Sequence, residues 1–304
     1  MKKIYLLLMV AVMSLGFVSC SDDDPDGATI FPTDSPARDN LDQWLLKNYT
    51  YPYNVDFQYK WQKIESDMKY NLVPADSAKS AKLAIIVKYL WFDAYNEVAG
   101  QDFIKTNVPR VITLIGSPAY ENTGTMVLGT AEGGYKVTLY MVNNLDDATL
   151  KDYDALTTYY FTTMHHEFTH ILNQKKPYNT DFDRISESDY VSGDWYQVPN
   201  ATALKKGFVR NYAMVEGRED FAETMAQYVT CTDAAWAAKL KTAGTKGAAI
   251  INQKLEMIRT YMKDSWNLDI DELHKAVLHR GREMSSLAVS YTHLRAHETA
   301  ANLV

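Results

Sequence analysis

The chain has 304 residues, a formal net charge of −7 at pH 7 and 46% hydrophobic residues, but only two cysteines. The acidic balance argues against nucleic-acid binding, which requires clustered Lys and Arg to neutralise phosphates. Two cysteines cannot form a disulfide framework, so stability must come from a large apolar core, which a chain of this length can bury.

The N-terminus has the pattern of an export signal. Two lysines precede an apolar run that ends at Val18, too short for a membrane span, which predicts a secretory signal peptide over residues 1–19. The run ends in "FVSC", which resembles the bacterial lipobox, where the cysteine is diacylated, although Phe17 departs from the usual leucine. We therefore expect lipidation at Cys20. The alternative is cleavage elsewhere, with Cys20 a spare thiol.

Residues 20–38 are rich in Asp, Pro, Ser and Gly and predict a flexible tether. Its start, "SDDD", resembles the segment that sends lipoproteins of Bacteroides-type bacteria to the outer surface. We expect an outer-membrane lipoprotein, exposed at the surface and touching the membrane only through its lipid. The alternative for the acidic run is a plain solvated linker.

The other end of the chain raises a different question. "SYTHLRAHETAANLV" resembles the translated sequencing-adapter tail found at the ends of some assembled genomes, so residues 288–304 are expected to be non-native. His293 and His297 lie four apart within it, with Glu298 beside them. We discount this pair as a metal site for that reason.

The folded part is expected to begin with helices. The segment over residues 56–70 carries Phe57, Trp61, Ile64 and Met68 at three-to-four-residue spacing, which predicts a helix. A second helix is predicted over residues 76–100, because it begins at an Asp/Ser cap and ends at a glycine.

Three runs rich in β-branched and aromatic residues follow, at 110–115, 125–130 and 134–142, and predict strands. The last two are separated by "AEG", which indicates a hairpin-like connection. In the last run apolar residues alternate with Lys136, Thr138 and Tyr140, as in a half-exposed strand.

Later segments are expected to be mainly helical. A long helix is predicted over about 147–174, then a polar loop region over 178–211. Helices resume at 216–228, 246–266 and 269–281. The simplest interpretation is one α+β domain over residues 39–287, with a small mixed sheet packed on the long helix.

That long helix contains "HHEFTHILNQ", in which His166 and His170 lie one turn apart on the same helical face. Both imidazoles can therefore reach one ion, while Glu167 reaches a water on that ion. This is the HExxH arrangement of zinc hydrolases, with glutamate as general base. The alternative is a packed amphipathic helix with incidental histidines, and His165 is expected to pack rather than bind metal.

A third ligand can come from "EDFAE", where Glu219 and Glu223 lie four apart on another predicted helix. In gluzincin metallopeptidases a glutamate of a second helix completes the zinc site, and an acid one turn later orients a ligating histidine. Glu219 and Glu223 match those two places. Asp220 points about 100° away around the helix, whereas Glu216 stays open as a rival ligand. The alternative for all these acids is a solvated helix N-terminus.

Tyr212 lies seven residues before Glu219. Some gluzincins, notably the anthrax lethal factor group, place at this spacing a tyrosine that hydrogen-bonds the developing oxyanion. An accidental match is equally open, because the chain has 21 tyrosines.

Together, the lipoprotein start, "HHEFTHILNQ" and "EDFAETMAQY" resemble the zinc-binding metallopeptidase lipoproteins of Bacteroidetes, a family associated with outer-membrane nutrient import. The resemblance implies a zincin-like fold and one Zn²⁺ per chain, held by His166, His170 and Glu219. It also implies peptide or protein substrates and importer components as partners.

The chemistry that the resemblance implies is hydrolysis by a zinc-activated water. Glu167 would act as base, Glu223 would orient His166, and Tyr212 would stabilise the oxyanion. The substrate would pair with an edge strand, for which residues 134–142 are the candidate, with an interior strand as the alternative. Two other functions stay open, namely a non-catalytic capture module for peptides or glycans and hydrolysis of a non-peptide amide.

Overall fold

The computed structural model describes residues 38–62, 69–121, 124, 126–127, 129–132 and 134–284. The chain divides after Asn40, and the fold is that of the unit that begins at Leu41. Cys20 and the tail at 288–304 lie outside the described residues, so lipidation and a non-native tail stay predictions.

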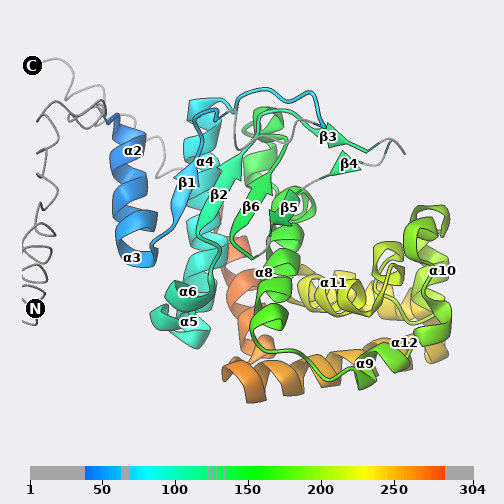
Figure 1. Cartoon of the computed structure of the whole chain (residues 1–304). Helices are drawn as coiled ribbons and strands as arrows, with labels where there is room; N and C mark the ends of the chain where they lie inside the picture. The colour runs from blue at the N-terminus through cyan, green and yellow to red at the C-terminus, as the bar shows by residue number, and fades with distance from the viewer. Residues whose placement is uncertain are drawn as a thin grey trace, which may run out of the picture. The chain divides into compact units, whose positions relative to one another are not determined.

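A four-stranded sheet forms the centre of this unit, in the order β1-β2-β6-β5 (Figure 1). Strands β1, β2 and β6 are parallel, and β5 runs antiparallel to β6. A second pair, β3 with β4, is antiparallel. The strands are β1 Asp56–Gln58, β2 Val111–Leu114, β3 Ala119–Tyr120, β4 Met126–Val127, β5 Gly129–Glu132 and β6 Lys136–Leu139.

The predicted hairpin is confirmed in its pairing, since β5 and β6 pair with Thr130 opposite Thr138. Its connection starts later than predicted, because Ala131 and Glu132 of the "AEG" sequence belong to β5. Two further details of the prediction are wrong. Strand β6 lies inside the sheet, and in the described sheet the edge strands are β1 and β5. All four residues of β6 are buried, Lys136 and Thr138 included, because neighbours cover the strand on both faces.

The helix predicted over residues 56–70 is wrong at its start, where the chain forms β1. Asn54 takes a left-handed conformation that ends the preceding helix. Val55, Phe57 and Tyr59 are then all buried, which is the two-residue period of a strand. Ile64 and Met68 lie outside the described residues.

The helix predicted over residues 76–100 is confirmed as a nearly continuous helical segment. It starts where the Asp76 carboxylate accepts the Lys79 amide at 2.9 Å, and it ends at Gly100, whose φ is +82°. The helices before strand β2 are α2 Asn40–Leu45, α3 Tyr51–Tyr53, α4 Ser77–Val87, α5 Asp93–Ala99 and α6 Gln101–Asn107, with π-helical turns at Leu46–Thr50 and Lys88–Phe92.

The helix that carries the histidines starts later than predicted. Helix α7 (Tyr153–Leu156), a π-helical turn (Thr157–Phe161) and α8 (Thr162–Lys175) follow one another directly. The Asp152 carboxylate caps the start by accepting the Ala155 amide at 3.0 Å. Upstream, 3₁₀ turns occupy Val142–Asn144 and Thr149–Lys151 instead.

Helix α8 lies alongside β5 and packs its apolar face into the core (Figure 1). Phe168, Ile171 and Leu172 are buried, as predicted. At Gly129 an added Cβ would come within 2.6 Å of the Thr163 side chain, so the glycine allows β5 to approach α8 closely. This packing fixes the HExxH helix against the edge of the sheet.

The C-terminal part is mainly helical, as predicted. The region over 178–211, predicted as a polar loop, instead contains short helices, α9 Asp181–Arg184 and α10 Asn200–Lys205, with 3₁₀ turns Glu187–Asp189 and η8 Ser192–Gln197. After the 3₁₀ turn η9 (Asn211–Met214) come α11 Gly217–Thr230, α12 Asp233–Trp266 and a helix at 270–284. No described helix combines the length and apolar character needed to cross a membrane.

Candidate metal centre

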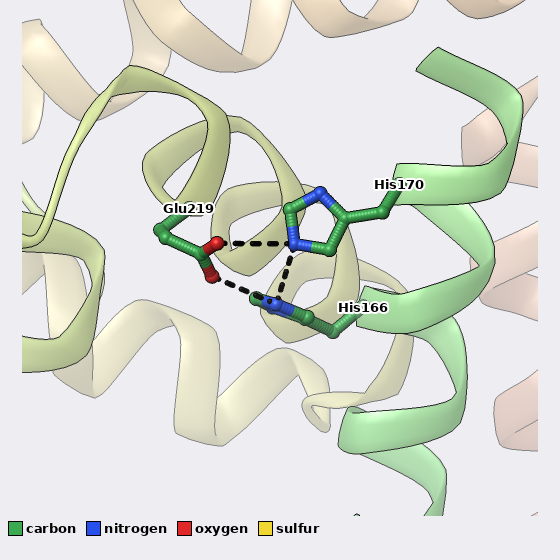
Figure 2. Close-up of side chains that lie close together, drawn as sticks. All are labelled: His166, His170 and Glu219. Carbon is green, nitrogen blue, oxygen red and sulfur yellow. Dashed lines mark hydrogen bonds and ion pairs between the residues drawn. The ribbon is translucent and has the colours of Figure 1, made fainter. Parts of the chain in front are cut away.

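Two helices bring three potential ligands together. His166 and His170 project from α8 and Glu219 from α11, and all three meet between the helices (Figure 2). The two histidine Nε2 atoms lie 2.9 Å apart. Glu219 Oε2 lies 3.0 Å from His166 Nε2, and Oε1 lies 3.4 Å from His170 Nε2.

These three groups fit a zinc ion. Zinc takes His nitrogen and carboxylate oxygen at about 2.0–2.2 Å in a tetrahedral arrangement, which requires donor atoms about 3.3 Å apart. The observed separations of 2.9 to 3.4 Å approach that value. The ligand atoms are therefore already grouped as a metal would require, and three protein ligands leave a fourth position open.

Glu223 lies directly behind one ligand. Its Oε1 is 2.8 Å from Nδ1 of His166, so Nε2 of that ring is left to face Glu219 and His170. Glu223 is itself held by Arg210, whose Nη2 donates to Oε1 at 2.8 Å. A carboxylate on the far nitrogen of a ligating histidine fixes the tautomer and orientation of the ring.

Charges at this centre perturb one another strongly. Burial alone would lower the pKa of His166, but the carboxylates of Glu219 and Glu223 raise it to about 10. Burial would likewise raise the pKa of Glu219, yet His166 and His170 hold it well below its usual range. The carboxylates thus create a site with strong affinity for positive charge.

Glu167 and Tyr212 line the same cleft, whose volume is about 700 Å³. Burial raises the pKa of Glu167, although the two neighbouring histidines counteract the effect. Burial, followed by the charge of Glu219, also raises the pKa of Tyr212. The ring centroids of Tyr212 and His166 are 5.9 Å apart, so the tyrosine lies beside the ligands.

The cleft has further walls that sequence reasoning did not assign to the site. Gly129 and Thr130 of β5 form one side, and Trp195 of turn η8 forms another. The Trp195 ring lies edge-on to Tyr212, with centroids 4.9 Å apart. The signal available in the sequence was the group of aromatic residues that interrupts the polar region at 178–211.

The rival acids face elsewhere. Glu216 is the N-cap of α11, is partly exposed and forms an ion pair with Arg218 at 2.7 Å. The Asp220 carboxylate is buried against Lys254, away from the histidines. Neither belongs to the His166, His170 and Glu219 cluster.

His165 packs as expected. It is fully buried, with Nδ1 3.0 Å from the Tyr95 hydroxyl. Burial lowers the pKa of His165 to about 3, so it stays neutral.

Comparisons with known proteins agree with this site. The sequence profile of a family described as "Putative zinc-binding metallo-peptidase" matches residues 34–271. A 2.10 Å crystal structure of a "putative zinc-binding metallo-peptidase" from Bacteroides caccae ATCC 43185 is similar, with 47% identity and a TM-score of 0.73. The match covers 85% of this chain and 97% of that chain. A comparison with curated proteins gives no match. The matched residues make up most of the chain and include His166, His170 and Glu219. The protein therefore belongs to the family described as "putative zinc-binding metallo-peptidase".

Proposed function

We propose that the protein is a zinc-dependent peptidase of the gluzincin type. The observation that carries the proposal is the meeting of His166, His170 and Glu219 in a cleft that also contains Glu167 and Tyr212. A single centre of this composition supports one zinc ion per chain. When bound there, zinc would act as a Lewis acid that activates water and polarises a carbonyl.

Glu167 is proposed as the general base. It follows His166 in sequence and lines the same cleft, so it can reach a water beside the ligands. The pKa of Glu167 is raised toward neutral pH, which suits a group that accepts a proton and then returns it. Glu167 would take a proton from the attacking water and deliver it to the leaving amine.

Two other groups would support this reaction. Glu223, backed by Arg210, would hold His166 in one tautomer and one orientation. Tyr212 keeps its proton because its pKa is raised, so its hydroxyl can donate a hydrogen bond to the oxygen of the tetrahedral intermediate.

The substrate is proposed to be an extended peptide. Strand β5 is one of the two edges of the described sheet, and its residues Gly129 and Thr130 line the cleft. An extended chain can add to such an edge through main-chain hydrogen bonds. We thus assign to β5 the substrate-pairing edge that was expected at residues 134–142.

The first prediction concerns the metal. His166→Ala and Glu219→Ala proteins should each lose most bound zinc, because each removes one of three ligands; elemental analysis of purified protein measures this. Glu216→Ala is the matched control and should retain one zinc per chain. Zinc retained by Glu219→Ala, or lost only from Glu216→Ala, would contradict the ligand assignment.

The second prediction concerns the base. Glu167→Gln should keep its zinc and its fold but hydrolyse peptides about 10²–10⁴-fold more slowly, the usual contribution of a positioned proton acceptor. Turnover of a peptide library, followed by mass spectrometry, measures the rate. An equal rate for wild type and variant would exclude the proposed mechanism, and zinc binding without hydrolysis in wild type would favour a capture module.

The third prediction concerns Tyr212. Tyr212→Phe removes only the hydroxyl and should lower kcat by about 10²-fold, the typical cost of one oxyanion donor. KM should change much less, since the interaction forms chiefly in the transition state. Steady-state kinetics on one cleaved peptide separates the two constants, and a change confined to KM would reassign Tyr212 to substrate binding.

We also propose that the protein is lipid-anchored in the outer membrane at Cys20, facing outward near components of a nutrient importer. The support for the anchor is the "FVSC" sequence and the acidic run that follows it, whereas the importer is what the family resemblance implies. Cells grown with a labelled fatty acid should label the wild-type protein but not a Cys20→Ala variant. Equal labelling of both proteins would reject anchoring at this residue.

A further inference from the structure

A buried ion pair joins α11, the helix that carries Glu219, to α12. Lys254 of α12 and Asp220 of α11 are both fully buried, with Nζ 2.6 Å from Oδ2. Asp220 follows Glu219 in sequence but points to a different side of α11. The pair is therefore next to the metal centre without facing the cleft.

Both charged groups also contact neighbouring segments of the chain. Lys254 also donates to the Gly207 carbonyl at 2.9 Å and lies 3.9 Å from the centroid of the Phe208 ring. Asp220 accepts from the Tyr190 hydroxyl at 3.1 Å. The Asp220–Lys254 ion pair thus joins four parts of the chain, namely α11, α12, the segment at 207–208 and the segment at 190.

Stability alone gives no reason to keep this pair. Desolvating two charges costs about as much as their attraction returns, and well-packed apolar residues are often as good or better. What an apolar cluster lacks is direction, because dispersion contacts tolerate sliding whereas charge-assisted hydrogen bonds fix both distance and angle. The pair is suited to setting the positions of the segments that it joins.

Three of the four joined parts lead into the cleft, the exception being α12. Arg210 and Tyr212 follow Gly207 closely in sequence, Trp195 follows Tyr190, and α11 carries Glu219. The 207 segment is also pressed onto α12, because an added Cβ at Gly207, where φ is +90°, would lie 2.3 Å from Ile250. Lys254 thus hydrogen-bonds this segment three residues before Arg210 and five residues before Tyr212.

We infer that Asp220 and Lys254 form a positioning pair, which sets Tyr212 relative to Glu219 and so controls the rate of the proposed reaction. Neither residue touches the substrate; both act through the segment that carries Tyr212. The inference rests on the proposed peptidase function for its kinetic consequence, but not for its structural consequence.

The test removes both charges together, in an Asp220→Leu/Lys254→Met protein, because a single substitution would leave an unpaired buried charge that could prevent folding. The control is Arg259→Met/Asp271→Leu, which removes a partly exposed ion pair between α12 and the helix at 270–284, outside the cleft. Thermal unfolding and zinc content are measured first, then kcat and KM on a peptide that wild type cleaves.

We expect the Asp220/Lys254 variant to fold and bind zinc with kcat at least about tenfold lower, since small misplacements of catalytic groups cost about that much or more. The control variant should keep wild-type kcat.

A double-mutant cycle distinguishes positioning from a general loss of structure. Adding Tyr212→Phe to the Asp220/Lys254 variant should lower kcat only to about the value of Tyr212→Phe alone, because both changes remove the same contribution. Fully multiplicative effects, or wild-type kcat in the Asp220/Lys254 variant, would overturn the inference.

Crystal structures of wild type and the Asp220/Lys254 variant give a readout that does not depend on activity. A displaced Tyr212 relative to Glu219 is expected, and superimposable positions would overturn the inference. By contrast, a wild-type protein that neither binds zinc nor cleaves peptides would refute only the proposed function.

Discussion

The contact between helices α8 and α11 is the constraint on which the site depends. It brings His166 and Glu223, both almost fully buried, to 2.8 Å from each other. A buried carboxylate is tolerated only with partners that replace water, and here the imidazole and the Arg210 guanidinium supply them. His166, Glu223 and Arg210 therefore form one interdependent unit, in which the loss of one member leaves a buried charge uncompensated.

The parts of this unit that sequence reasoning found are those encoded by local periodicity. His166 and His170 are one helical turn apart, as are Glu219 and Glu223, and a four-residue spacing fixes a common face whatever the rest of the fold does. Arg210 was missed because its role depends on how an irregular segment returns to α11. Trp195 was missed for the same reason, since no spacing rule connects a 3₁₀ turn to a helix elsewhere in the chain.

The errors in the sheet have a related cause. Residues 134–142 show the right residue types for a strand, and β6 forms there, but its neighbours are set by contacts distant in sequence. The alternation that suggested a half-exposed strand is overridden by burial of every β6 residue. At the other edge, Val55, Phe57 and Tyr59 satisfied the period of a strand while Phe57 and Trp61 suggested a helix. A short strand gives too few residues to decide between the two periods.

Strand β5, proposed above as the docking edge, also carries a hazard for the fold. An open strand edge presents main-chain donors and acceptors to any extended chain, including another copy of the same protein, and is a common starting point for aggregation. Here the edge is only four residues long and opens into a cleft rich in carboxylates. Brevity and negative charge both discourage sheet growth between copies. A structure that must leave this edge accessible would thus be limited in how far it could lengthen β5 without losing solubility.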